Sequence, residues 1–208
     1  MDFTERIKIM ENEFMEFPKI ARLSREMIIT EKIDGTNAQV CIAEDGSIIA
    51  GSRTRWITPQ SDNYGFAKWV EDNKQDLIKL GVGRHFGEWW GSGIQRGYGL
   101  TNGDKRFSLF NVVRWCLYGF EPQRIITGDP RIEKYQDILP KCCGLVPILY
   151  RGLFDTTKVD EVLWDLKITG SRASEGFMRP EGVVVYHVAG NIGFKKTIEK
   201  DEIPKSKG

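Results

Sequence analysis

The chain has 208 residues, of which 40% are hydrophobic, and its 30 Lys and Arg nearly balance its 29 Asp and Glu. A chain of this size and hydrophobic content can bury one good core, which predicts a globular protein of one domain with at most a small appendage. The formal net charge of +1 excludes a protein that grips a polyanion through bulk charge. Any contact with nucleic acid must therefore come from local clusters of basic residues.

The cysteines, histidines and N-terminal residues restrict the class of protein further. The four cysteines show no Cys-x-x-Cys spacing and the two histidines, His85 and His187, lie far apart, which argues against a structural zinc site. The first residues lack a signal sequence, and no apolar run approaches the ~20 residues of a membrane span. We therefore expect a cytoplasmic protein in a reducing, intracellular environment, with no membrane contact.

The most informative segment is Lys-Ile-Asp-Gly-Thr-Asn at residues 32–37. The pattern predicts a strand over 27–33 that runs into Lys32, a turn at the Asp-Gly pair, and a second strand over 38–43. Partial burial and neighbouring positive charge disfavour the protonated form of a lysine, so a lysine held at a strand end can attack phosphorus near neutral pH. The alternative is an ordinary hairpin that carries an exposed lysine.

Further strands are predicted, in chain order, by β-branched and aromatic runs bounded by turn residues. These runs cover residues 47–53, 84–90, 106–115, 144–150, 182–188 and 191–197. Asp45-Gly46 and the stretch 189–191 have the composition of hairpin turns, so many neighbouring strands should be antiparallel.

Two helices interrupt the strands. The first is predicted from Ser61 or Asp62, as N-cap, to Gly81, and the second from about residue 156 to 169. Apolar residues recur three and four positions apart in both, so these faces should pack in the core. A short helix over 131–139 is also expected. The elements together predict one α+β domain over residues 1–200 and a flexible tail over 201–208.

Several strand ends carry side chains suited to binding a nucleotide. The guanidinium of Arg53 could make forked contacts with phosphate or ribose oxygens, and Glu88 lies in an aromatic strand followed by glycines that permit close approach of a ligand. The ring of Phe110 could stack on a purine. Each has an ordinary alternative, which is a solvated strand end for Arg53, a structural salt bridge for Glu88 and core packing for Phe110.

The last two strands add charged groups of both signs. Glu181 opens a β-branched strand, and a hard divalent cation prefers such oxygen ligands. Lys195 and Lys196 are adjacent in the final strand and must point to opposite faces, so at most one of them can face a site lined by that sheet.

The order of these motifs resembles the covalent nucleotidyltransferase superfamily of ATP-dependent ligases and capping enzymes over about residues 27–200. The segment 31–37 is most similar to the RNA ligase family of the RNA ligase 2 type, because DNA ligases and capping enzymes usually carry arginine where this chain has Asn37. The resemblance implies a nucleotidyltransferase (adenylation) domain of two mainly antiparallel sheets with flanking helices, similar to the catalytic domain of ATP-dependent DNA and RNA ligases.

The resemblance also implies roles for individual residues. Lys32 would take AMP from ATP as a lysyl phosphoramidate, while Lys195 or Lys196 would hold the α-phosphate and the departing pyrophosphate. Glu88 and Glu181 would hold Mg²⁺ or Mn²⁺. Glu31 would recognise the adenine edge and Phe110 would stack on the base. The residues placed at the nucleotide are Glu31, Ile33, Asn37, Arg53, Glu88, Phe110, Glu181 and Lys195.

The implied function is an ATP-dependent polynucleotide ligase, with RNA favoured over DNA, that joins 5′-phosphate and 3′-hydroxyl ends through lysyl-AMP and an adenylated nucleic-acid end. One alternative is a minimal ATP-dependent DNA ligase or a GTP-using capping-type nucleotidyltransferase. Another is a noncatalytic nucleic-acid-binding module. The chain departs from the family at Lys195-Lys196, where two lysines separated by one residue are usual, and in the short sequence after this strand, so a partner is expected to supply a substrate clamp.

Basic residues near these motifs are candidates for gripping a nucleic-acid end, because such an end must approach the adenylate along a basic path. They are Arg84, His85, Arg96, Lys105, Arg106, Arg114, Arg172 and Arg179. The glycines between residues 91 and 99 predict a loop that moves during nucleotide entry.

Overall fold

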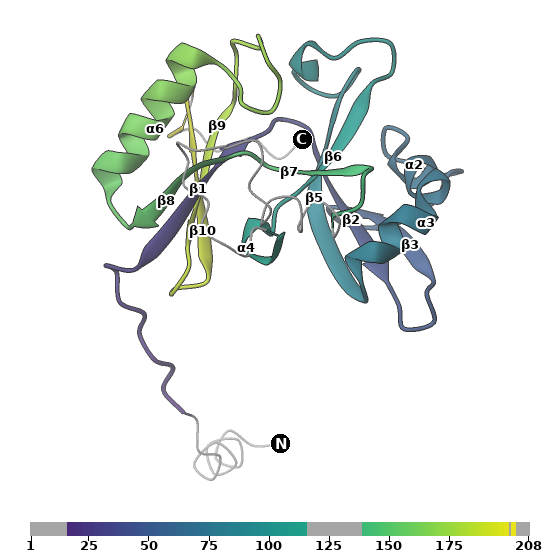
Figure 1. Ribbon diagram of the computed structural model, residues 1–208, viewed down its shortest axis with the longest axis horizontal. Helices are drawn as coiled ribbons and strands as arrows, with labels where there is room; N and C mark the ends of the chain where they lie inside the picture. The colour runs from purple at the N-terminus through teal and green to yellow at the C-terminus, as the bar shows by residue number, and fades with distance from the viewer. Residues whose placement is uncertain (1–15, 116–138, 200, 203–208) are drawn as a thin grey trace, which may run out of the picture.

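A computed structural model describes residues 16–115, 139–199 and 201–202, which form two β-sheets that flank a cleft, with helices on their outer sides (Figure 1). This α+β architecture confirms the predicted fold class. The first sheet is antiparallel, in the order β10 (Ile192–Thr197), β9 (Gly182–His187), β1 (Glu26–Lys32) and β8 (Ile148–Leu153). In the described residues no helix has the length and apolar character of a membrane span.

The second sheet has six strands, and all its neighbours are antiparallel except β6 and β7. Its order is β4 (Trp56–Ile57), β3 (Ile48–Ser52), β2 (Thr36–Ile42), β5 (Gly83–Gly91), β6 (Lys105–Leu109) and β7 (Cys143–Leu145). The predicted hairpin turns at 45–46 and 189–191 are confirmed, since they join β2 to β3 and β9 to β10.

The Asp-Gly pair after Lys32 connects the two sheets and does not close a hairpin. Strand β1 lies in the first sheet and β2 in the second, so the hairpin alternative is wrong. A Cβ on Gly35 would lie 2.5 Å from the carbonyl oxygen of Trp89, a distance that only glycine permits. The glycine therefore lets the chain pass close against β5 as it leaves Lys32.

Helix α6 (Thr156–Thr169) covers the outer face of the first sheet and matches the predicted second helix. The carboxylate of Asp155 caps its N-terminus by accepting the Thr157 N–H at 2.8 Å, and Gly170, with φ of 83°, ends it. Its apolar side packs against side chains from β1 and β9. The buried members of this core are Met27, Ile29, Val159, Leu166, Val183 and Val185.

The predicted first helix is divided into three short pieces, which cover the outer face of the second sheet. These are α2 (Phe66–Asp72), α3 (Lys74–Leu77) and the 3-10 turn η1 (Ile78–Leu80). The break occurs at Asn73, which has φ of −108° and donates its side-chain amide to the Trp69 carbonyl at 2.8 Å. The N-cap is Gly65, so the predicted N-cap at Ser61 or Asp62 is wrong, although the Asp62 carboxylate still accepts the Ala67 and Lys68 N–H groups in the first turn.

Two predicted strands are wrong in part. The strand expected over 106–115 ends at Leu109, and Val112–Trp115 forms the helical turn α4, because the Asn111 side chain accepts the Arg114 N–H at 3.0 Å. The strand expected over 144–150 is interrupted before β8 by Pro147, which has no N–H to donate to a ladder. Most of the helix expected over 131–139 and most of the tail expected over 201–208 lie outside the described residues.

Candidate active site

The two sheets enclose a cavity of about 1000 Å³. Side chains of both sheets line it, as do residues of the turn that includes α4. From the first sheet these are Ile28, Thr30, Lys32, Val184, Tyr186 and Lys195. From the strands of the second sheet and the residues that directly follow β3 and β6, the lining includes Asn37, Arg53, Arg84, His85, Phe86, Glu88, Phe110 and Asn111.

The alternation of side chains along β1 places Lys32 in this cavity. Residues 28, 30 and 32 line the cavity, whereas residues 27 and 29 belong to the core beneath α6. The Lys32 side chain is 21% exposed. The amine at the end of β1 is therefore partly buried and open to a ligand, as the sequence predicts.

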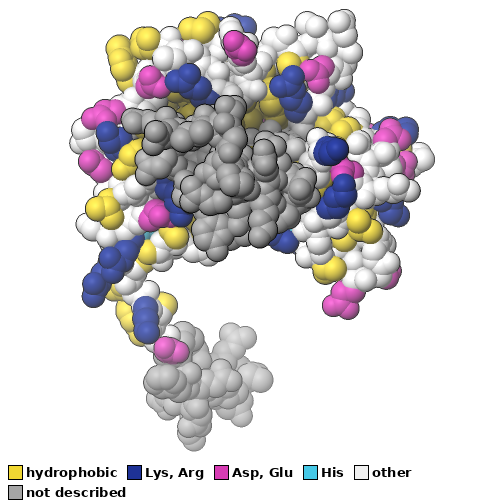
Figure 2. Space-filling view, in the orientation of Figure 1, with side chains coloured by type: hydrophobic (Ala, Val, Ile, Leu, Met, Phe, Trp, Pro, Cys, Tyr) yellow, Lys and Arg dark blue, Asp and Glu magenta, His cyan; other side chains and the backbone are white. Residues whose placement is uncertain are grey.

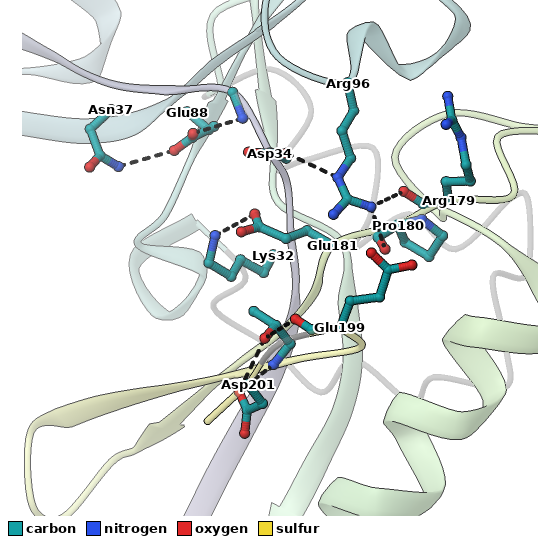
Figure 3. Close-up of polar contacts among 12 residues, drawn as sticks. Lys32, Asp34, Asn37, Glu88, Arg96, Arg179, Pro180, Glu181, Glu199 and Asp201 are labelled. Atoms are coloured by element: carbon teal, nitrogen blue, oxygen red, sulfur yellow. Dashed lines mark hydrogen bonds and ion pairs between the residues drawn. The ribbon is translucent and has the colours of Figure 1, made fainter. Parts of the chain in front are cut away.

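The ammonium of Lys32 forms an ion pair with Glu181, whose side chain is only 4% exposed. Glu181 directly precedes β9, and Lys32 is aligned with Gly182 in the β1–β9 register, so the strand pairing brings the two side chains together. Figure 3 shows this pair beside the Asn37–Glu88 contact. A potential nucleophile and a potential proton acceptor are thus in direct contact.

Glu88 lies across the cleft on β5 and is held by two donors. The Gly35 N–H and the Asn37 side-chain amide each donate to its carboxylate at 3.1 Å. Burial raises the pKa of Glu88 to about 7; the Gly35 hydrogen bond and the Lys32 charge oppose the shift, and the Glu181 charge adds to it. Glu88 and Glu181 are therefore close enough to repel each other.

Glu31 lines the cavity, as a residue at the nucleotide should, but its carboxylate is bound within the protein. It is 1% exposed, and its carboxylate accepts hydrogen bonds from the Ser171 hydroxyl at 2.6 Å and from the Arg172 and Ala173 N–H groups at 2.7 and 3.0 Å. The pKa of Glu31 is raised by burial, and these donors oppose the shift. The carboxylate thus anchors the loop after α6, and recognition of adenine by Glu31 remains a prediction.

The structure separates Lys195 from Lys196. Lys195 lines the cavity with Lys32, whereas Lys196 forms an ion pair with Asp160 of α6 on the other face of the sheet. The expectation that only one of them faces the site is confirmed, and Lys195 is the one that does so. A catalytic role for Lys196 stays a prediction, which its position on the opposite face does not favour.

The remaining nucleotide-binding candidates border the cavity in different ways. Arg53 is exposed, and Phe110, 40% exposed, lies just after β6. Ile33 is 4% exposed and packs in a core with Ile28 and Tyr98. Stacking of adenine on Phe110 and a phosphate contact of Arg53 remain predictions.

A comparison with known protein families matches residues 25–200 to the RNA ligase family. The chain belongs to this family. The match covers the cavity, both glutamates and Lys195, and it confirms the resemblance found in the sequence. A comparison with curated proteins found no match.

Solved structures of RNA ligases share the fold of this family member. Naegleria gruberi RNA ligase with pyrophosphate aligns at a TM-score of 0.59 and 19% identity, over 84% of this chain and 50% of that one. A mutant of that ligase with ATP and Mn aligns at a TM-score of 0.58 and 18% identity, and the alignment covers 85% of this chain and 51% of the mutant. The apo structure of another mutant aligns at a TM-score of 0.58 and 19% identity, and the alignment covers 92% of this chain and 52% of that one. The chain spans about half the length of these structures.

The described part of the cavity has only some of the ligands that a divalent ion needs. Among the described residues no three His, Cys, Asp or Glu side chains are arranged around one point. Glu88 and Glu181 are two carboxylates whose mutual repulsion a cation would relieve, and Mg²⁺ is commonly held by one or two carboxylates with phosphates and water. The two residues fit that arrangement, and their metal role remains a prediction.

Several basic residues expected to grip the substrate are engaged elsewhere. Arg84, His85 and Arg114 line the cavity. Four of the others bind the protein itself: Arg106 pairs with Asp104, Arg172 with Asp165, Arg96 with Asp34, and Lys105 donates to the Tyr64 carbonyl. A role for Arg179 in binding the substrate stays a prediction. Figure 2 shows Lys and Arg interspersed with Asp and Glu on the described part of this face, without one continuous basic patch.

Tyr98 supports the turn after Lys32, and the sequence-based predictions missed this residue. Tyr98 is fully buried, and its hydroxyl accepts the Asp34 N–H at 2.9 Å. Its ring stacks on Phe177 with centroids 4.4 Å apart. The only sign of Tyr98 in the sequence was an aromatic residue among several glycines, and the glycines favoured a mobile loop. With Ile94 and Tyr98 both 0% exposed, the mobility expected for 91–99 finds no support.

Proposed function

We propose that this chain catalyses ATP-dependent joining of RNA ends through a covalent adenylate on Lys32. The observation that carries the proposal is the ion pair of Lys32 with the buried Glu181, because Lys32 lines the same cavity as Lys195, Asn37 and Glu88. Attack of an amine on a phosphate needs a deprotonated nucleophile, in-line placement and neutralisation of phosphate charge. The described residues offer a group for each need.

The first step would form a bond between Lys32 Nζ and the α-phosphorus of ATP while the bond to the departing pyrophosphate breaks. The ammonium must lose a proton, and the paired carboxylate of Glu181 is the nearest acceptor that the structure offers. A bound Mg²⁺ or Mn²⁺ would supply neutralisation of the phosphate oxygens. AMP would then pass to an RNA 5′-phosphate, and a 3′-hydroxyl would displace it.

The nucleotide would lie between the sheets. We place its phosphates against Lys195 and Arg53, its ribose near Asn37 and Glu88, and its base over Phe110, all of which border the cavity or lie beside it. Related Naegleria gruberi RNA ligase structures contain ATP and Mn, or pyrophosphate, which supports the choice of ATP and a divalent ion. RNA as acceptor rests on the family.

A strand-joining assay tests the proposal. The protein would be incubated with Mg²⁺ or Mn²⁺, with ATP or GTP, and with labelled 5′-phosphate and 3′-hydroxyl ends in single-stranded or nicked form, as RNA or as DNA of the same sequence. We expect joined RNA with ATP and none with Lys32→Met. Joining of DNA alone, or use of GTP alone, would favour the ligase or capping alternative; binding without joining would favour a noncatalytic module.

A further inference from the structure

We propose that Arg96 is a positioning residue that keeps Lys32 and Glu181 in contact by clasping the two segments that carry them. The inference rests on the proposed function, since it concerns the same lysine. Arg96 Nε donates to the Asp34 carboxylate at 3.0 Å. Its Nη1 donates to the carbonyl oxygens of Arg179 and Pro180 at 3.0 and 3.4 Å (Figure 3).

The residues that Arg96 contacts are close in sequence to Lys32 and Glu181. Asp34 is two residues after Lys32, and Pro180 directly precedes Glu181. The side chain of Arg96 by itself therefore joins the turn after β1 to the turn before β9. A small displacement of either turn would change the geometry of attack, and errors of about 1 Å can reduce rates about 100-fold.

The loop that carries Arg96 is fixed on both sides. Ile94 and Tyr98 are two residues before and after it, and both are 0% exposed. Ile94 packs in the core of the second sheet, and Tyr98 packs in the core that also contains Ile28 and Ile33. Arg96 therefore projects from an anchored support, which a clasp requires and a mobile loop would not provide.

The contacts require a guanidinium. One side chain reaches a carboxylate and two carbonyl oxygens in separate segments, and the fork of Arg supplies separate N–H groups for them. A lysine at this position would keep the positive charge but bring all its donors to one nitrogen. We therefore expect Arg96→Lys to break the clasp while preserving charge.

The kinetic test follows attachment of AMP to Lys32 in a single turnover over a range of ATP concentrations. Arg96→Lys and Arg96→Met are compared with the wild-type protein and with Arg151→Met as control. Arg151 pairs with Glu26 at 3.0 Å and is 29% exposed, against 30% for Arg96. We expect both Arg96 variants to lower the maximal rate by about 10- to 100-fold with little change in the half-saturating ATP concentration, and the control to change neither.

Hydrogen–deuterium exchange of peptides that contain residues 33–36 and 179–182 tests the clasp without ATP. We expect faster exchange in both peptides together in Arg96→Lys, and wild-type exchange in the control. A wild-type maximal rate or unchanged exchange in Arg96→Lys would overturn the inference, as would a loss confined to ATP affinity. If the wild-type protein takes no AMP, the proposed function fails, while exchange still decides whether the clasp exists.

Discussion

Lys32 and Glu181 are 149 residues apart in sequence and form an ion pair in the cleft between the two sheets. Pairing of β1 with β9 creates this contact, because Lys32 is aligned with the residue that follows Glu181. The lysine is partly exposed and the carboxylate is buried, so the amine is open to the cavity while the buried carboxylate stays in contact with it.

Replacement of Glu181 by Gln keeps the shape of the side chain and removes its charge. We expect the rate of Lys32 adenylation to fall by about 100-fold, equivalent to about 2.7 kcal/mol, because the amine loses its nearest proton acceptor. Single-turnover labelling with ATP measures this rate. Glu199→Gln, at an exposed position beyond β10, is the matched control; equal rates in the two variants would refute a role for Glu181.

The two adjacent lysines of β10 should behave differently. Lys195→Ala should reduce adenylation by at least about tenfold, since its side chain lines the cavity, whereas Lys196→Ala should remain within about twofold of the wild-type protein, since its partner is Asp160 on α6. Quantitative AMP labelling of both variants measures the difference. A larger loss in Lys196→Ala would mean that the strand register differs from the one described here.

Glu88 should make the stability of the protein depend on pH near neutrality. Its pKa is about 7 in the folded protein, compared with an ordinary 4.5. The folded state therefore binds the proton more tightly between these values, and the free energy of unfolding should fall as pH rises from 4.5 to 7. The full effect is on the order of 3 kcal/mol.

Glu88→Gln removes the titrating group. Comparison of this variant with the wild-type protein therefore separates the effect of Glu88 from that of the other titrating groups. The free energy of unfolding of both proteins would be measured with denaturant from pH 4.5 to 8. As pH rises, the wild-type protein should lose stability relative to the variant. A difference that stays constant over this range would show that Glu88 has an ordinary pKa.

The hydroxyl of Tyr98 should contribute to stability through the turn after Lys32. Tyr98→Phe leaves the Asp34 N–H without its acceptor in a part-buried position, which should cost about 1–3 kcal/mol of unfolding free energy. Tyr150→Phe is the control, because its hydroxyl makes only a 3.5 Å contact with the exposed Leu153 and should change stability by less than about 0.5 kcal/mol. Equal denaturation midpoints for both variants would contradict this role.

The sequence was sufficient to predict the elements whose signals are local. The 156–169 helix ends at a glycine, and the alternation in β10 separates Lys195 from Lys196. The predictions failed where a side chain redirects the backbone, as Asn73 does in the first helix and Asn111 after β6. Such a local competition for hydrogen bonds has no periodic pattern in the sequence.

The parts of the site that depend on long-range contacts could not be predicted. The family resemblance implied a ligand contact for Glu31, but nothing in the sequence indicated that Ser171 and the following backbone donate to its carboxylate. Likewise, Arg96 was predicted to grip a nucleic-acid end, because its partners within the protein lie 62 to 84 positions away in sequence and leave no local signal. Only the tertiary structure shows which charges are already neutralised.

The most direct test of the central claim is intact mass spectrometry of the protein after incubation with ATP and Mg²⁺ or Mn²⁺, followed by peptide mapping. The account predicts one added AMP, located on Lys32, absent from Lys32→Met and released by pyrophosphate. A protein that gains no AMP, or carries it on another residue, would contradict the assignment of Lys32 as the nucleophile.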